Sequence, residues 1–576
     1  MKRVLPPLLL PLLICNMALA QTDTTKPKFA ISGTAGIMYE HYGLSRKPTG
    51  WTGFLPRRPW NQVRFNFSPN MQFGKNFSLP FNFNFATTPT NFAGPYTGIG
   101  KQTLSQFLTN PMNSFGLNPK YKWAELQLGT QYLNYSELST GDIGVFGAGF
   151  DLRPKGYYIK FFTGLSQQGV NFFTGPPATT GAYKRTNWMF SLGKTKEEKY
   201  EVGINFVKAK DDSSSAIPPP PNIKPQEGFT MSIAGKLNFE KGWYVKLEGA
   251  QSIYTKDLTL PLDSGKASFK PFIKGHASTV KDYAGDAAFG KKGKNLDIGI
   301  KLKYIGAGFQ TPGFPFMLPD RFDYTLNTRF NAWKNKDGVH RMNVTGSIGK
   351  RVNNVSDNTL KAEQFIGNLN WFTQFDDHFS LNINFNNFGF QTPGGINPFG
   401  IKNVSNDFGI TPTYTWGNEK VVHLLSLNYN YSKYDERDVL TGNVTSNNTH
   451  TGLLTYVPTF LTKDLSPDFS VMYFYNSLPG FTLKLITISS GLSMPAMKKK
   501  MNLRGQLQYN YSKTGGFTNN NNLIASFSSD WKLNKKLTWT TFISSNNFKY
   551  GNEITPNNAS YLESIIRTGF NYRFGN

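Results

Sequence analysis

The stretch Phe77–Phe85, which reads FSLPFNFNF, places an apolar side chain at every second position and mostly small polar or amide side chains between them. This period of two is typical of a β-strand, because successive side chains of a strand point to opposite faces of the sheet. The alternation recurs in Asp297–Tyr304 and in Arg341–Ile348, where charged or amide side chains take the polar positions. Charged groups on one face and apolar groups on the other indicate a wall between water and lipid.

Segments of this kind follow one another along the chain, and we count about 26 of them, from Phe29–Tyr39 to Tyr561–Phe574. The count falls to 22 if two regions are read differently. Alternation is poor in Ile253–Lys291, and the turn in Tyr456–Asp468 is unclear. The sequence therefore predicts an all-β fold, a closed antiparallel transmembrane β-barrel of 22 to 26 strands with no separate soluble domain.

Short and long connections alternate between the predicted strands, as they do between the periplasmic turns and outer loops of outer-membrane barrels. The short set comprises 154–156, 194–199, 240–242, 376–378 and 534–536, and the long set comprises 166–182, 209–227, 390–406 and 548–560. We expect the segments Phe85–Asn113, Ile253–Lys291 and Phe390–Asn406 to cover or enter the lumen. They carry aromatic side chains that would be poorly placed in open water.

The N-terminal segment 1–20 has the layout of a secretory signal peptide, with a basic start, an apolar run and the ending Ala18-Leu19-Ala20. Cleavage after Ala20 would leave a short lead, 21–28, before a single barrel, 29–576. A retained membrane helix would need about 20 apolar residues, and prolines interrupt this shorter run. A lipoprotein anchored at Cys15 is a further alternative, but Ile14 stands where a small residue is expected. The expected location is the cell outer membrane.

The composition fits this interpretation. Cys15 is the only cysteine, so a mature chain without the first 20 residues has no disulfide and no thiolate metal site. Mean hydropathy is low, at -0.40, whereas aromatic residues make up 15% of the chain. A transmembrane barrel accounts for both the low mean hydropathy and the many aromatic residues, because only alternate side chains face lipid and aromatic residues collect at the membrane boundaries.

The formal net charge of +26 becomes 26 − 2 = +24 without Lys2 and Arg3. Such an excess favours anionic surroundings, and lipopolysaccharide phosphates or anionic solutes suit an exported chain. No signature of a nucleic-acid-binding domain is present, so nucleic acid is not an expected partner.

Charged residues on the polar faces of the predicted strands should line the lumen, because a charge that points into lipid costs about 2 to 4 kcal/mol at the midplane. Four acidic residues lie near them: Glu201, Glu248, Asp297 and Glu563. Two interpretations stay open at this point, a path that attracts anions and a set of ion pairs across the lumen. The predicted basic lumen residues are Arg64, Lys160, Lys246, Lys301, Lys303, Arg341, Arg567 and Arg573.

No sequence motif indicates an enzyme. The six histidines are isolated from one another, and arrangements such as HExxH, GxSxG or a Walker A loop are absent from the sequence. Asp376-Asp377-His378 is the best catalytic candidate, but it falls in a predicted periplasmic turn, where aspartate is favoured for local hydrogen bonding. The clusters Lys291–Lys294 and Lys498–Lys500 are interpreted as charged turns, with docking of a protein partner as the alternative. We expect no catalytic residue, metal or cofactor.

The sequence also repeats itself. Phe115–Trp123, FGLNPKYKW, returns as Phe408–Trp416, FGITPTYTW, and each copy follows a strand that opens with Phe-Ser-Leu. The shared order indicates a duplicated block of wall, although similar hairpins can converge on such phrases. The hexapeptide GFQTPG occurs twice, at Gly308–Gly313 and Gly389–Gly394, which predicts the same turn chemistry at the rim.

The stretch Phe115–Gly149, with its Gly-Leu-Asn-Pro-Lys-Tyr-Lys-Trp segment, resembles large bacterial outer-membrane β-barrel proteins known mostly from genomes. The resemblance is clearest in the first third of the chain. It implies a location and a fold, and it implies no functional residues.

The last predicted strand, Tyr561–Phe574, resembles the targeting strand of outer-membrane proteins. This resemblance implies the barrel-assembly machinery as a partner, although Gly575 and Asn576 follow the terminal aromatic residue.

Two functions compete on this basis. The first is a channel or translocation barrel with a basic lumen, which passes solutes or macromolecules. The second is a structural or assembly protein of the outer membrane that binds protein partners at its turns or loops, or lipopolysaccharide, without transport. An outer-membrane hydrolase ranks last, for want of a motif. Planar-bilayer conductance distinguishes the first two.

Overall fold

The structure is a computed structural model that describes residues 29–45, 58, 60–87, 113–141, 143–174, 180–196, 198–334, 340–357, 361–391, 401–438, 443–515, 519–551 and 560–575. The predicted signal peptide and lead, residues 1–28, lie outside this set. The described residues contain no helix that is both long enough and apolar enough to cross a membrane.

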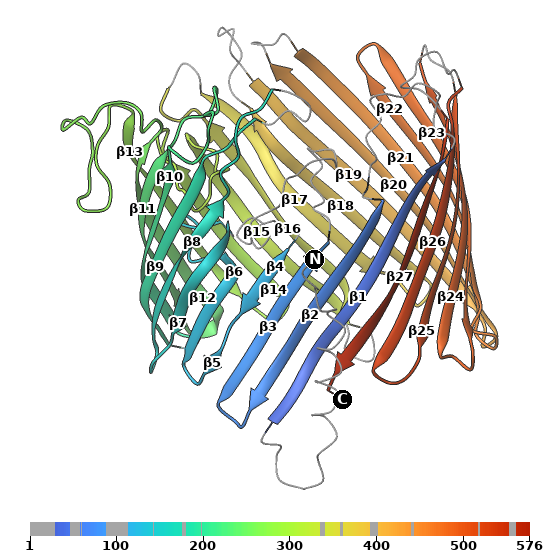
Figure 1. Ribbon diagram of the computed structural model, residues 1–576. Coiled ribbons are helices and arrows are strands. Elements are labelled where there is room, and N and C mark those ends of the chain that lie inside the picture. The colour runs from blue at the N-terminus through green and yellow to red at the C-terminus, as the bar shows by residue number, and fades with distance from the viewer. Residues whose placement is uncertain are drawn as a thin grey trace.

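The described chain forms one sheet of antiparallel strands joined in sequence order, with one short 3-10 turn, η2, at Glu240–Gly242 (Figure 1). The strands are β1 Phe29–Ser45, β2 Asn61–Phe73, β3 Phe77–Ala86, β4 Ser114–Leu117, β5 Lys120–Tyr121, β6 Ala124–Leu133, β7 Ile143–Leu152, β8 Tyr157–Gln167, β9 Lys184–Lys196, β10 Tyr200–Asp212, β11 Glu227–Asn238, β12 Trp243–Thr255, β13 Thr279–Lys292, β14 Leu296–Ile305, β15 Arg321–Lys334, β16 His340–Asn353, β17 Ala362–Gln374, β18 Phe379–Gln391, β19 Ile401–Gly417, β20 Val421–Asp438, β21 Asn443–Phe460, β22 Ser466–Leu478, β23 Phe481–Ala496, β24 Met501–Thr514, β25 Asn520–Lys532, β26 Leu537–Lys549 and β27 Tyr561–Phe574.

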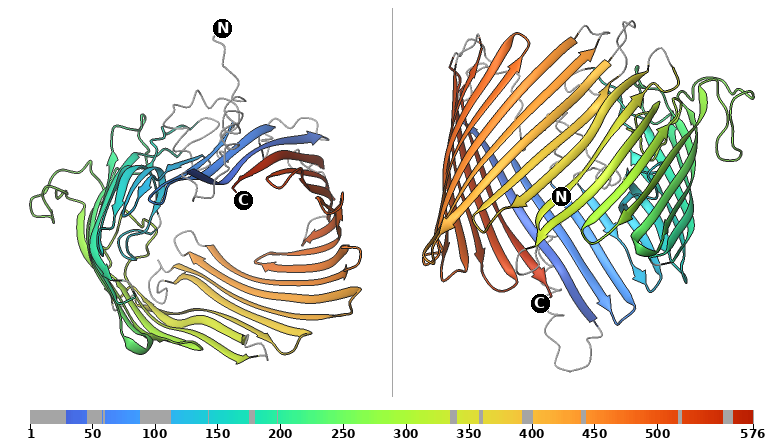
Figure 2. Two further views of the ribbon diagram at one scale, coloured as in Figure 1. Left: turned by 90° about the horizontal axis from the view of Figure 1, so that it is seen from below. Right: turned by 180° about the vertical axis from the view of Figure 1, so that it is seen from behind.

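The sheet closes on itself. β1 pairs with β2 on one side and with β27 on the other, where Gly33–Ser45 is in register with Leu562–Phe574. β4 and β5 occupy one place in the wall, since both pair with β3 and with β6, so the 27 strands make 27 − 1 = 26 positions. The predicted closed antiparallel barrel of about 26 strands is confirmed, and Figure 2 shows it from one end and from behind.

The turns at one end of the barrel are short. In the turn Pro154–Gly156, Lys155 and Gly156 both have positive φ, at 45° and 85°, which gives the backbone twist that tight hairpins require. The connections at the opposite end are mostly longer, as the sequence predicts, although β22 and β23 are joined there by only Pro479 and Gly480.

The two faces of the wall differ in chemistry. Large apolar side chains on one face are exposed, and these include Ile233, Leu247, Ile300, Ile348, Val471, Ile488 and Leu507. Side chains of the intervening positions are polar, small or buried, as in β10, where Gly203, Asn205 and Val207 are buried between exposed or half-buried neighbours. A closed wall with an exposed apolar outer face is the solution that lets strands cross a membrane with every backbone group paired.

The two copies of the internal repeat occupy equivalent places in the wall. Phe115 pairs with Phe83 of the preceding strand, and Phe408 pairs with Phe385 in the same way. The first copy is interrupted between β4 and β5, whereas the second is continuous within β19. This equivalent register supports the interpretation of a duplicated block.

The segment 256–278, between β12 and β13, corrects one prediction. It lies against the outer face of the wall near the long-loop end, not in the lumen (Figures 1 and 2). Phe272 stacks on Phe229 at 5.3 Å between ring centroids and contacts Trp188 at 5.5 Å. Both partners share a face with the exposed Ile233, as their register shows. We call residues 256–278 the outer hairpin.

Of the other two segments predicted to enter the lumen, most of Phe85–Asn113 lies outside the described residues, as does 392–400 of Phe390–Asn406. Two shorter connections fold inward instead. They are residues 134–141, which follow β6, and residues 306–320, between β14 and β15, and we call them the first and second lumen loops.

Candidate lumen site

Three of the predicted basic residues converge inside the barrel. Lys246 lies on β12, and Lys301 and Lys303 lie on β14 with β13 between the two strands. Each alternates along its strand with exposed outward side chains such as Leu247 and Ile300. The wall therefore places the three ammonium groups on the inner face, on one side of the barrel.

The three lysines surround a carboxylate that comes from the first lumen loop. Lys246 and Lys301 donate hydrogen bonds to Glu137, one to each carboxylate oxygen, and Lys303 Nζ lies 3.9 Å from Glu137 Oε2. Lys301 also lies 3.2 Å from Asp286, which is fully buried. A residue 109 to 164 positions away in sequence thus neutralises a wall cluster that the strand pattern alone predicts to be positive.

A second carboxylate holds the loop by its backbone. The backbone N–H groups of Glu137 and Leu138 each donate a hydrogen bond of 3.1 Å to Glu248. Glu248 lies two residues from Lys246 on the same face of β12 and is buried. Burying a carboxylate is tolerated only where donors satisfy its oxygens, and here the loop backbone supplies them.

The second lumen loop packs against the first. The hydroxyl of Thr311 donates to the carbonyl of Ser139, and Gly141 N–H donates to the carbonyl of Gly313 at 2.8 Å. Thr311 and Gly313 belong to the first GFQTPG copy, so this copy shapes a lumen loop and not a simple rim turn. Its Gly313 fits closely, since a Cβ there would lie 2.2 Å from Ser139 O.

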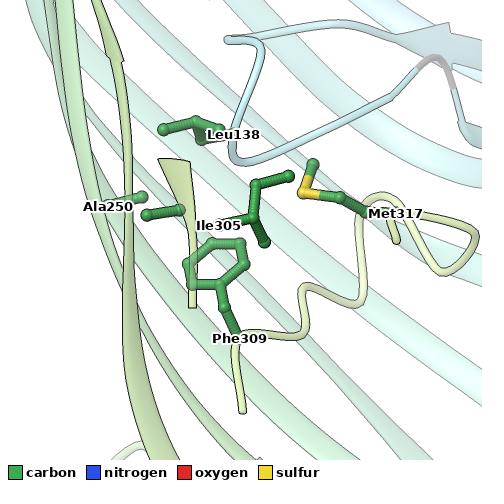
Figure 3. Close-up of a cluster of buried hydrophobic side chains, with 6 residues drawn as sticks. Leu138, Ala250, Ile305, Phe309 and Met317 are labelled. Carbon is green, nitrogen blue, oxygen red and sulfur yellow. The ribbon is translucent and has the colours of Figure 1, made fainter. Parts of the chain in front are cut away.

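An apolar cluster fixes both loops to the wall. Figure 3 shows Leu138 from the first loop above Phe309 and Met317 from the second, with Ile305 and Ala250 from β14 and β12. Burial of apolar surface is worth roughly 25 cal/mol per Å², so the cluster anchors both loops to the wall. Tyr135 of the first loop adds a second apolar contact, against the buried cluster that includes Val145 and Phe162.

The electrostatic environment of Glu137 favours its charged form. Burial alone would raise the pKa, but the hydrogen bonds from Lys246 and Lys301 and their positive charges lower the pKa of Glu137 from 4.5 to about 2. The carboxylate is therefore ionised throughout the physiological range.

The remaining predicted basic residues lie apart from this site. Arg567 binds the buried Glu40 across the β1–β27 seam, and Arg341 binds Asp377 of a short turn at 3.0 Å. Arg64 donates to Gln62 at 2.7 Å. Lys160 lies 5.2 Å from the ring of Tyr158, and Arg573 is exposed at the end of β27.

Five of the eight predicted residues are thus in ion pairs: Lys246, Lys301, Lys303, Arg341 and Arg567. Of the two interpretations left open by the sequence, the described contacts support ion pairs for these five. Glu137 was missed because it lies in a connection without periodicity, and its sequence neighbours carry no signal of what it binds.

Strands β18 to β26 form the opposite wall (Figure 2). Amide and hydroxyl side chains on its inner face bind one another. Thr487 donates to Asn510 at 2.7 Å, and Asn428 donates to Thr411 at 2.7 Å. The pairs Ser470–Ser489, Gln508–Asn510, Asn430–Asn428 and Thr413–Ser426 continue this lining. Such groups hydrate well and repel neither sign of charge.

The turn Asp376-Asp377-His378 has a structural role. Asp376 accepts hydrogen bonds from the backbone N–H groups of Phe379 and His378, and these bonds lower its pKa. His378 Nδ1 contacts the carbonyl of Thr415, and Asp377 pairs with Arg341. Within the described ranges, no three His, Cys, Asp or Glu residues are grouped as a metal site would require.

The two lysine clusters are also located. Lys291 and Lys292 end β13, 5.6 Å and 5.5 Å from the rings of Trp243 and Tyr244. Lys499 lies in the turn before β24, 2.5 Å from Asp464. The predicted charged turn holds for Lys499, whereas Lys291 and Lys292 lie at the end of a strand, beside the turn. A docking role stays a prediction.

No protein-family model matches the sequence, and no curated protein matches it. Among solved structures, the P pilus usher PapC translocation pore has a TM-score of 0.37 at 10% identity, covering 95% of this chain and 100% of that one. The siderophore receptor PirA of Pseudomonas aeruginosa has a TM-score of 0.39 at 11% identity, covering 95% and 81%. An E. coli P pilus tip assembly intermediate has a TM-score of 0.41 at 8% identity, and the chain spans 63% of its length. Similarities at this level do not identify a substrate or partner.

Proposed function

We propose that this protein is an outer-membrane channel that passes polar solutes along the inner face of β18–β26. The observation that supports the proposal is the division of the lumen wall into two parts. The lumen loops pack against strands between β6 and β14, whereas the opposite wall presents hydrogen-bonding side chains to the interior. Such a lining keeps this side of the interior hydrated, which a path for polar solutes requires.

The expected location is the outer membrane, because a closed strand wall with an apolar outer face and a polar inner face is the architecture of barrels in that membrane. The described ion pairs reduce the positive charge predicted for the lumen. We therefore propose weak ion selectivity for the wild-type channel in place of strong anion selectivity.

Planar-bilayer recording of the purified full chain tests the proposal. Two variants at one inward position, Ser526→Lys and Ser526→Glu, should shift the reversal potential in opposite directions if ions pass this wall. The outward neighbour Ala525, changed to Thr, serves as a control that should leave the reversal potential unchanged. Absence of conductance from a folded protein, or equal reversal potentials for both Ser526 variants, would favour the structural or assembly role.

A further inference from the structure

The three lysines around Glu137 have the form of a binding site with its ligand in place. Their ammonium groups come from the rigid wall, on β12 and β14, whereas the carboxylate between them comes from a connecting loop. Lysine ammonium groups bind carboxylate and phosphate as point charges with three donors each. The Glu137 side chain therefore fills a position that an anion from outside the chain would also suit.

The loop does not depend on the Glu137 side chain for its position. Glu248 binds the loop backbone, Thr311 binds Ser139, and Leu138 is buried in the apolar cluster. The carboxylate is 35% exposed, in contrast to Leu138, which is fully buried. Rotation of one side chain would thus empty the lysine cluster while the loop stayed against the wall.

The charges around the emptied cluster favour an anion. With Glu137 withdrawn, Lys246, Lys301 and Lys303 face Asp286, which lies 3.2 Å from Lys301. Glu248 remains engaged by two backbone N–H groups of the loop. Three cations against these two carboxylates leave one unbalanced positive charge, in a setting where interactions are screened less than in open water.

We propose that Lys246, Lys301 and Lys303 form a lumen site for carboxylate or phosphate anions, and that Glu137 occupies it as an internal competitor. An anion that enters the lumen displaces the Glu137 side chain and takes its hydrogen bonds. The site gives this side of the lumen a selective function that the polar wall lacks. This inference rests on the proposed channel only for the route of the anion, and binding itself does not require transport.

The test measures binding of inorganic phosphate to the purified full chain by titration calorimetry. Glu137→Gln removes the competing charge, and the Kd for phosphate should fall at least about tenfold relative to wild type. Lys301→Gln in the Glu137→Gln background should raise the Kd again by about tenfold or more. Asp377→Asn is the matched control, because it removes the carboxylate that pairs with Arg341 of β16, outside the lysine cluster. Its Kd for phosphate should equal that of wild type.

An equal Kd for wild type and Glu137→Gln would overturn the proposal, as would tight binding that survives Lys301→Gln. If Glu137→Gln fails to fold, by its far-ultraviolet circular dichroism, the comparison moves to wild type against Lys301→Gln. Wild type should then bind phosphate weakly and Lys301→Gln not at all, and equal binding would overturn the proposal. Tight phosphate binding without bilayer conductance would contradict the proposed channel but support the anion site. Conductance without phosphate binding would support the channel and contradict the anion site.

Discussion

The hydroxyl of Thr311 donates a 2.8 Å hydrogen bond to the backbone carbonyl of Ser139, across 172 residues of sequence. Both residues are buried, and the bond joins the two lumen loops. The loops therefore behave as one unit, and a change in either should loosen the other.

Thr311→Val keeps the shape of the side chain and removes the donor. The carbonyl of Ser139 would be left buried without this partner, at a cost of about 1 to 3 kcal/mol. Hydrogen exchange of the 134–141 segment should speed up by about 5- to 150-fold, which corresponds to that range. Thr413→Val, which alters a hydrogen bond of the opposite wall, should leave exchange in this segment unchanged. Unchanged exchange in Thr311→Val would show that the apolar cluster alone holds the loops.

The ionised Glu137 should stabilise the fold in a defined pH window. Its pKa falls from 4.5 to about 2 on folding, so its contribution is complete above pH 4.5 and is lost as the pH falls through about 2. The Tm difference between wild type and Glu137→Gln should therefore stay constant from pH 8 to about 5 and shrink in more acidic solution. A Tm difference that grows on acidification would show that the lysine cluster does not lower the pKa of Glu137.

Adjacent residues of β16 should respond in opposite ways to the same substitution. Ile348 is 54% exposed on the outer face, and Ser347 is its inward neighbour. Ile348→Arg places a charge in lipid and should cost about 2 to 4 kcal/mol in the free energy of unfolding from vesicles, whereas Ser347→Arg should cost less than about 1 kcal/mol. Equal losses in urea titrations of the two variants would contradict the assignment of faces.

The outer hairpin should depend on Phe229, which is 3% exposed beneath Phe269 and Phe272. Phe229→Ala removes the ring on which both aromatic groups stack, and losses of about 3 to 5 kcal/mol are typical of buried Phe→Ala changes. Hydrogen exchange at the Phe269 amide, which donates to Ile273 O, should accelerate at least about 100-fold. Phe239→Ala, at an exposed site, is the control. Similar exchange rates in the two variants would show that Phe229 does not hold the outer hairpin against the wall.

Strand alternation predicted the wall well because each strand must present one face to lipid and one to the interior. The last strand, Tyr561–Phe574, has the predicted bounds, and the strand in the poorly alternating Ile253–Lys291 region is β13, Thr279–Lys292. The irregular part of that region belongs to the outer hairpin. Phe272 is half-buried, but against the outer face of the wall, because composition does not say which face of the wall covers an aromatic side chain.

The lumen site could be predicted only in part. Lys246, Lys301 and Lys303 follow from alternation, since a charge within a strand must face inward. Glu137 does not follow, because its contacts depend on how a nine-residue connection folds against strands more than 100 residues away. Ion pairing across such separations leaves no periodic trace in the sequence.

The outer hairpin makes the outline of the barrel unequal in the plane of the membrane. Over β9–β12, near the long-loop end, the outer hairpin adds a second layer of backbone and side chains to the wall (Figure 1). On the opposite side, Val471, Ile488 and Leu507 leave the wall smooth and apolar. A neighbouring protein in the membrane can therefore pack directly against that smooth side, whereas the outer hairpin would hold it away from the covered part of the wall.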